Sequence, residues 1–269
     1  MKITAVLDTT ILTDVLLKHA TRGVAVRESL SRFDHVVVPG YAIKEFVSGP
    51  LTYFTWFHNR VVTEKTLSGA IDWLHRLSRT PRRYAASTAV EALREAVARL
   101  EKQHAATLIE RYGARASVST VLKDQIRLSV RGTILTAWAR LRDYSIVDVP
   151  GCYAAAELFR DGELLLIREG KCASGDCGFW PVAGARASLE LLRTAMEATS
   201  PSRERDRRLA VLTRLGETSN TSVTDKECRS LGDVMIALSV PPEATLVTSN
   251  VRDFAPLCEA LGKRLLNPY

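Results

Sequence analysis

Two acidic residues follow strand-like segments of the sequence. Asp8 ends the run 2–7, whose apolar residues are typical of a short buried strand. Asp253 comes shortly after a second such run, 244–248. Because ligand sites in open parallel sheets form beyond the carboxyl ends of the strands, we expect both carboxylates at one edge of a sheet.

Two further acids are expected at that edge. Glu45 lies in a helical pattern after the strand-like run 35–38, and Asp233 lies in the segment 232–237. Four carboxylates in one cleft repel one another, and a divalent cation offsets that repulsion. Mg²⁺ prefers oxygen ligands, activates water and neutralises charge that builds on a phosphate. The four acids together therefore predict a Mg²⁺ site for chemistry on phosphates.

Each acid also has a structural interpretation. Asp8 precedes a helical pattern and suits a helix cap. Asn250 and Asp253 have the spacing of a capping box, and Asp233 suits the first turn of a helix. Glu45 suits a solvated surface. Taken one at a time the acids leave both interpretations open, whereas the four in this order favour a shared site.

A group of arginines has aromatic neighbours in the sequence. The arginines are Arg76, Arg79, Arg82 and Arg83, and the aromatic residues are Trp56, Phe57 and Trp73. Arginine and aromatic side chains together hold phosphates and stack bases, so we predict that the four arginines bind nucleic acid. The alternative is a solvated loop beside core aromatic residues.

Cysteine and serine chemistry is not indicated. The chain has 5 Cys, an odd and sparse set that predicts free thiols in a reducing, cytoplasmic compartment. Cys152, Cys172 and Cys177 lack the tighter pair spacing that is common in four-ligand Zn²⁺ sites. Cys228 and Cys258 are expected to be small buried residues. The sequence has no Gly-x-Ser-x-Gly nucleophile elbow.

The segments that position the four acids alternate between strand and helix. Strands are predicted at 2–7, 35–38, 244–248 and 263–266, and helices at 9–17, 24–31, 41–47, 224–240 and 250–261. Gly49-Pro50 is expected to end the helix 41–47, which follows the second predicted strand. The alternation predicts an α/β fold with a parallel sheet, built from the discontinuous core 1–50 and 224–269.

The middle of the chain, 51–223, is predicted to be a largely helical insertion. Helical periodicity extends over 86–112 and 121–142, and strand-like runs occur at 144–149 and 163–167. We expect this insertion to contribute at least one strand to the main sheet.

Composition limits the class of protein. The 269 residues are 46% hydrophobic and 25% charged, which excludes collagen-like, fibrous and disordered chains. No apolar run approaches the roughly 18 residues of a membrane span, and the first eight residues do not form a signal peptide. The formal net charge of +7 favours a polyanion such as nucleic acid as partner.

The segments around the four acids resemble the PIN-domain nuclease family. Residues 5–10 resemble the family's opening strand with its first metal-binding Asp and a hydroxyl residue, and 37–46 resemble the segment that holds its acidic Glu. Residues 232–237 resemble its Asp followed by a small-apolar helix. Residues 244–254 resemble its final strand and Asn/Asp turn, and are the most specific match.

This resemblance implies a Rossmann-like three-layer α/β/α sandwich and an endoribonuclease that depends on Mg²⁺ or Mn²⁺. The implied catalytic and metal-binding residues are Asp8, Glu45, Asp233 and Asp253, with Thr10 and Asn250 orienting water or phosphate. Many family members are toxins of toxin–antitoxin pairs, which implies an antitoxin partner. The insertion between Glu45 and Asp233 is far longer than in compact members, and its basic residues are expected to hold RNA through phosphates.

Three alternatives stay open. The protein is a nucleic-acid-binding module of the same fold without cleavage, a nuclease that cuts structured DNA by the same metal chemistry, or an interaction protein whose activity an antitoxin docked on the insertion masks.

Overall fold

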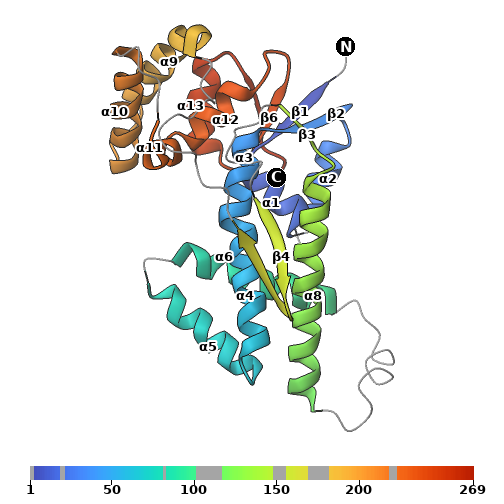
Figure 1. The fold of residues 1–269 in the computed structure, drawn as a ribbon. Coiled ribbons are helices and arrows are strands. Elements are labelled where there is room, and N and C mark those ends of the chain that lie inside the picture. The colour runs from blue at the N-terminus through green and yellow to red at the C-terminus, as the bar shows by residue number, and fades with distance from the viewer. Residues whose placement is uncertain are drawn as a thin grey trace.

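The chain forms an α/β structure around a five-stranded parallel sheet (Figure 1). The computed structural model describes residues 3–18, 22–80, 83–100, 117–147, 156–168, 182–217 and 223–269. The strands are β1 (Thr4–Leu7), β2 (His35–Val38), β3 (Ser145–Ile146), β6 (Thr245–Val247) and β7 (Arg264–Leu266), in the order β3-β2-β1-β6-β7. The prediction of an α/β fold with a parallel sheet is confirmed.

β1 is the central strand and lies between β2 and β6. Ala5, Val6 and Leu7 have no solvent exposure, as expected for a parallel strand covered on both faces. Ala5 is opposite Val36 on one side and Thr245 on the other. The chain builds the sheet outward through β2 and β3, then returns to β6 and β7 on the opposite side. The topological switch point therefore lies between the carboxyl ends of β1 and β6, where ligand sites form in such sheets.

Helices that connect the strands pack near these ends, an arrangement compatible with three layers. They are α1 (Thr9–Leu16), α2 (Gly23–Leu30), α3 (Gly40–Phe46), α11 (Asp225–Ser230), α12 (Gly232–Ser239) and α13 (Val251–Ala260). Apart from the break between α11 and α12, these positions and the strands match the sequence predictions for the two ends of the chain to within a few residues.

The predicted helix end at Gly49-Pro50 is wrong. The chain continues from α3 through a π-helical turn, η1 (Val47–Leu51), directly into α4 (Thr52–Thr63). A π turn uses wider backbone hydrogen bonds, and the Thr52 hydroxyl donates to the Val47 carbonyl at 2.7 Å, so the missing N–H of Pro50 does not stop the helix. Buried side chains of η1 and α4, including Leu51 and Phe54, make continuation favourable.

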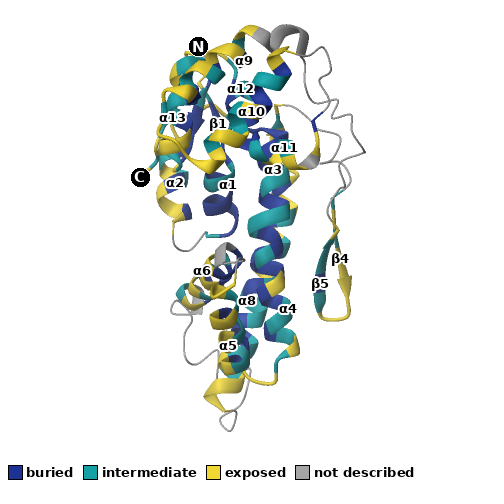
Figure 2. Cartoon of the chain, turned by 90° about the vertical axis from the view of Figure 1, so that its left-hand side faces the viewer, coloured by how far each residue is buried: buried dark blue, intermediate teal, exposed yellow. Residues whose placement is uncertain are grey.

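The middle stretch divides into two parts in space. α4 extends away from the sheet and packs with α5 (Leu67–Ser78), α6 (Arg83–Leu100) and α8 (Val118–Leu141) (Figures 1 and 2). The hairpin of β4 (Glu157–Asp161) and β5 (Leu164–Arg168) lies against α4, where the Asn59 side chain donates to the Leu165 carbonyl at 2.7 Å and accepts from the Leu165 N–H at 2.9 Å. α9 (Val182–Glu197) and α10 (Arg203–Glu217) instead pack at the sheet end, against α13 and α11.

One strand of the main sheet, β3, comes from this middle stretch and pairs with β2. Of the helices that the structure describes, none is both long and apolar enough to cross a bilayer.

Candidate functional site

A cavity of about 1010 Å³ lies at the carboxyl edge of the sheet, beside the switch point. Residues of α1, α3, η1, α4, α6 and α12 and of the turn after β6 line it. Three of the four predicted acids, Asp8, Glu45 and Asp233, are among the lining residues. We call this cavity the carboxylate cleft.

Asp8 serves as both a helix cap and a wall of the carboxylate cleft. Its side chain is 1% exposed, and Oδ1 accepts hydrogen bonds from the backbone N–H groups of Thr10 and Ile11. Oδ2 accepts from the Thr248 hydroxyl at the end of β6, which joins the two strand ends. Burial raises the pKa of Asp8 to about 6, although these hydrogen bonds act in the opposite direction. Asp8 therefore caps α1, as the structural interpretation predicted, and also lines the cleft.

Glu45 projects from α3 toward the start of α1. The Thr9 hydroxyl donates to Glu45 Oε2 at 2.7 Å. Burial raises the pKa of Glu45 to about 7, and the negative charges of Asp233 and Asp8 add to this rise against the Thr9 hydrogen bond. Asp8 and Asp233 therefore lie close enough to Glu45 for their charges to affect its ionisation.

Gly232 gives Glu45 and Tyr41 room at the start of α12. A Cβ atom on Gly232 would lie 2.6 Å from Glu45 Oε1 and 2.7 Å from Tyr41 Cε1. The Tyr41 ring is held in place because its hydroxyl donates to the Cys228 carbonyl at 3.1 Å. Only a glycine fits between α12 and α3 at this point.

Asp233 forms an ion pair with an arginine that the sequence analysis did not single out. Arg208, on α10, lies 2.6 Å from Asp233 Oδ2, and the two side chains are only 11% and 16% exposed. Burial raises the pKa of Asp233, the charge of Asp253 raises it further, and Arg208 opposes both. The packing of α10 against α11 brings Arg208 to Asp233. No periodicity or motif in the sequence links the two residues.

Asp253 lies close enough to Asp233 for its charge to act on that acid, but it is not among the residues that line the carboxylate cleft. It is exposed, and its Oδ2 accepts a hydrogen bond from the Asn250 side chain at 3.1 Å. The Asn250 side chain makes no cap hydrogen bond to the backbone, so the capping-box alternative is wrong. Thr10 Oγ1 accepts from the backbone N–H of Ser249 at 3.2 Å, which ties α1 to the turn that carries Asn250.

Basic and aromatic side chains flank the acids in the cleft. They are Lys18, Arg22, Lys44, Arg229, Tyr41, Tyr53 and Phe254. The Lys44 ammonium lies 5.5 Å from the centre of the Tyr41 ring. No motif in the sequence marks these residues as part of the site, although Lys44 adjoins the predicted Glu45. The feature of the sequence that could have pointed to Lys44 is its position directly before a candidate acid.

The predicted arginine group is not part of the cleft lining in the described chain. Arg76 and Arg79 are exposed on and just after α5, at the end of the molecule opposite the sheet (Figure 2). Arg82 and the side chain of Arg83 lie outside the described residues.

The cysteine predictions divide in the same way. Cys152, Cys172 and Cys177 lie outside the described residues, whereas Cys228 and Cys258 are free and buried, as predicted.

The donor atoms of the cleft match a hard divalent cation in kind. Asp8, Glu45 and Asp233 supply oxygen only, which suits Mg²⁺ or Mn²⁺. Among the described residues, Glu45 Oε1 and Asp233 Oδ1 have no hydrogen-bond or ion-pair partner. In the same part of the chain, no three His, Cys, Asp or Glu side chains are arranged to hold one ion together. Arg208 engages Asp233 in this arrangement.

No protein-family model, curated protein or solved structure matches the chain.

The raised pKa of Glu45 predicts how stability varies with pH. In the unfolded chain this carboxyl ionises near 4.5, whereas in the folded protein it ionises near 7. Between these two pH values the folded state binds more protons than the unfolded state. The unfolding free energy therefore falls as the pH rises from about 4.5 to about 7. We expect chemical denaturation in chelator to give an unfolding free energy roughly 2–3 kcal/mol lower at pH 8 than at pH 5 from Glu45 alone. Glu45→Gln should flatten the profile, and equal pH dependence in both proteins would contradict the assignment.

Proposed function

We propose that the protein is an endoribonuclease that depends on Mg²⁺ or Mn²⁺ and hydrolyses phosphodiester bonds in the carboxylate cleft. The observation that carries the proposal is the convergence of Asp8, Glu45 and Asp233, from two ends of the chain, on one cavity. Their burial and mutual repulsion make a bound cation favourable.

We also propose that the core is Rossmann-like and specifically PIN-like. The strand order β3-β2-β1-β6-β7 supports this, because the sheet grows outward on both sides of β1. The segments that resemble the PIN-domain family supply β1, β2, β6 and the starts of α12 and α13. The acids accordingly lie at the switch point, where this class of fold binds its ligands.

The proposed reaction is an in-line attack of water on phosphorus. The new P–O bond forms as the opposite P–O bond breaks, and the leaving nucleotide oxygen takes up a proton from solvent. Asp8, Glu45 and Asp233 would hold the metal ion, which when bound supplies a water of lowered pKa and neutralises negative charge on the phosphate. A carboxylate of the cleft accepts the proton of the attacking water. Thr10 and the turn with Asn250 position water or phosphate, as their link through Ser249 favours. Asp253, which does not line the cleft, tunes the charge of Asp233.

The other cleft residues suit a nucleic-acid strand. Lys44 and Arg229 lie beside the acids and can bind phosphate oxygens, while Tyr53 and Phe254 offer rings on which bases stack. The helical part of the middle stretch extends the wall of the cleft, since Thr88 of α6 also lines it. An antitoxin partner and binding of nucleic acid by the arginines near α5 stay predictions.

The experiment that tests the function is cleavage of labelled single-stranded RNA and of single-stranded and branched DNA. We expect RNA cutting with Mg²⁺ or Mn²⁺ and none with chelator, measured by denaturing gels. Cutting of branched DNA alone would favour the DNA nuclease. RNA binding without cleavage under every metal condition would favour the module that binds without cutting.

A further inference from the structure

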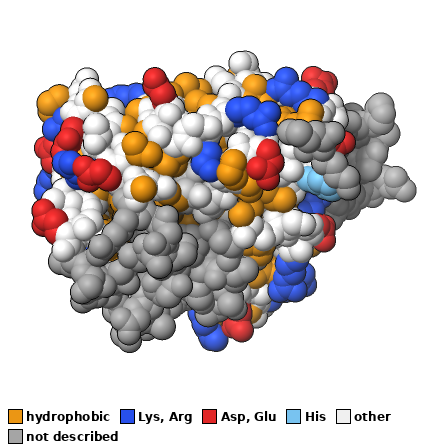
Figure 3. Space-filling model, turned by 90° about the horizontal axis from the view of Figure 1, so that it is seen from above, with side chains coloured by type: hydrophobic (Ala, Val, Ile, Leu, Met, Phe, Trp, Pro, Cys, Tyr) orange, Lys and Arg blue, Asp and Glu red, His pale blue; other side chains and the backbone are white. Residues whose placement is uncertain are grey.

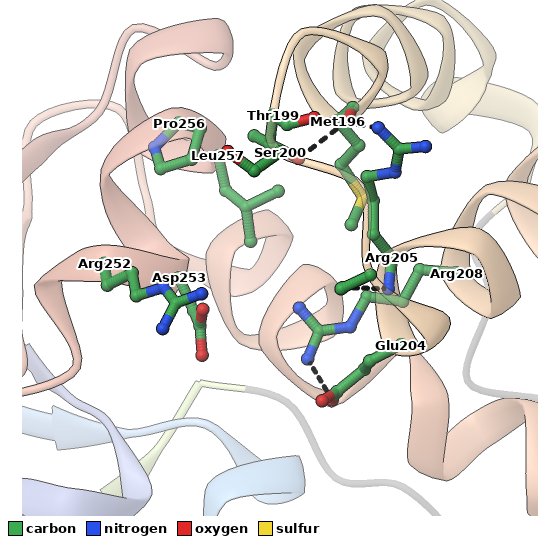
Figure 4. A pocket seen from close by; sticks show the side chains of 11 residues that line it. Met196, Thr199, Ser200, Glu204, Arg205, Arg208, Arg252, Asp253, Pro256 and Leu257 are labelled. Atoms are coloured by element: carbon green, nitrogen blue, oxygen red, sulfur yellow. Dashed lines mark hydrogen bonds and ion pairs between the residues drawn. The ribbon is translucent and has the colours of Figure 1, made fainter.

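A second, smaller pocket of about 240 Å³ lies beside the carboxylate cleft (Figure 4). It is formed by the end of α9, the segment that leads into α10, the first turns of α10 and the first turns of α13. Its polar lining consists of three arginines, three hydroxyl residues and two acids: Arg205, Arg208, Arg252, Thr199, Ser200, Ser202, Glu204 and Asp253. We call it the arginine pocket.

The arginines differ in how far their charge is already compensated. Arg252 is exposed and forms no ion pair with any described residue. Arg205 donates to the Thr199 carbonyl at 2.8 Å and pairs with the neighbouring Asp206, whose side chain is 60% exposed. Such exposed pairs are weak and exchange readily for a stronger anion. Three positive and two negative side chains line the pocket, so its lining keeps a net charge of +1, which Arg252 presents to an incoming anion.

The wall between the pocket and the carboxylate cleft is the ion pair of Arg208 and Asp233. Arg208 lines the arginine pocket, and Asp233 lines the cleft. Arg208 also pairs with Glu204 at 2.7 Å, and its Nε, although buried, has no hydrogen-bond partner. In Figure 4, Arg252 and Asp253 stand on one side of the pocket and Arg205 and Arg208 on the other. An anion in the pocket would lie next to a phosphate held at the acids.

The face of the molecule seen from the sheet end carries side chains of both charges. On the face seen from the sheet end, described Lys and Arg side chains lie among Asp and Glu side chains (Figure 3). We therefore attribute the attraction of an anion to the side chains of the pocket itself, which act at short range.

We propose that the arginine pocket is an anion subsite that binds a phosphate of the substrate strand next to the phosphate that is cut. The identity of the strand rests on the proposed function, whereas binding of a phosphate group does not. Arg252 and Arg205 contact the phosphate oxygens, the Ser200 hydroxyl adds a hydrogen bond, and Arg208 keeps the pocket aligned with Asp233.

The test measures RNA binding by the full chain in chelator, so that cleavage plays no part. We expect Arg252→Gln to weaken binding of a labelled RNA about fivefold, and to lower the slope of log affinity against log salt by about 1, because one phosphate contact is lost. Pyrophosphate should compete with RNA on the wild type and compete less on the variant. Arg205→Gln removes a second positive charge, on the opposite side of the pocket, and should also weaken RNA binding.

The matched control is Arg207→Gln. Arg207 is exposed on α10, the helix that also carries Arg205. It does not line the pocket, and it carries the same charge as Arg252. The subsite is overturned if Arg252→Gln and Arg207→Gln bind RNA equally well, or if pyrophosphate competes equally on all proteins. Melting curves of each variant show that the fold is intact. If the pocket variants weaken binding while metal-dependent cleavage is never seen, the proposed function fails and the anion site stands.

Discussion

Glu45→Gln is expected to lower the rate of metal-dependent RNA cleavage by roughly 100-fold or more. The substitution keeps the size of the side chain and its ability to accept from the Thr9 hydroxyl, but it removes the negative charge that a cation needs. Glu45 is a cleaner test than Asp8, which also caps α1, or Asp233, which also pairs with Arg208. The measurement is the single-turnover cleavage rate at saturating Mg²⁺.

Glu259→Gln is the matched control, because Glu259 is exposed on α13 outside both cavities. It should retain the wild-type rate. The charge argument also predicts that Glu45→Gln melts at a higher temperature than wild type in chelator, since a buried carboxylate beside two others destabilises the fold. A Glu45→Gln protein that cleaves at the wild-type rate and is less stable than the wild type would show that Glu45 is not part of the metal site.

Gly232→Ala is expected to disrupt both the site and the fold. The new methyl group would meet Glu45 Oε1 at 2.6 Å and the Tyr41 ring at 2.7 Å. The glutamate can swing away, but Tyr41 is 2% exposed and hydrogen-bonded to Cys228, so α12 itself has to shift and carry Asp233 with it. We expect a loss of about 1–3 kcal/mol in unfolding free energy and at least a tenfold loss of cleavage rate.

Gly132→Ala separates this effect from helix propensity. Gly132 lies within α8, and nothing stands within 4 Å of a Cβ atom there. The same substitution should leave cleavage unchanged and raise stability by up to about 1 kcal/mol. Similar melting temperatures and rates for the two alanine variants would show that the contact between α12 and α3 is not tight.

The sequence by itself determined the elements at the two ends of the chain. Strand-like runs and helical spacing located β1, β2, β6 and β7, because these patterns report local backbone period and burial. They also placed Asp8 directly after a buried strand. Gly49-Pro50 was misleading because a π turn and buried apolar contacts kept the helix going.

Only the tertiary structure decided which side chains meet. Arg208 reaches Asp233, and Gly232 makes room for Tyr41 and Glu45, across long separations in sequence. Asp253, although well placed by its strand, lines the arginine pocket rather than the cleft. A periodic pattern fixes the face of its own strand or helix, whereas the neighbour on that face depends on how distant elements pack.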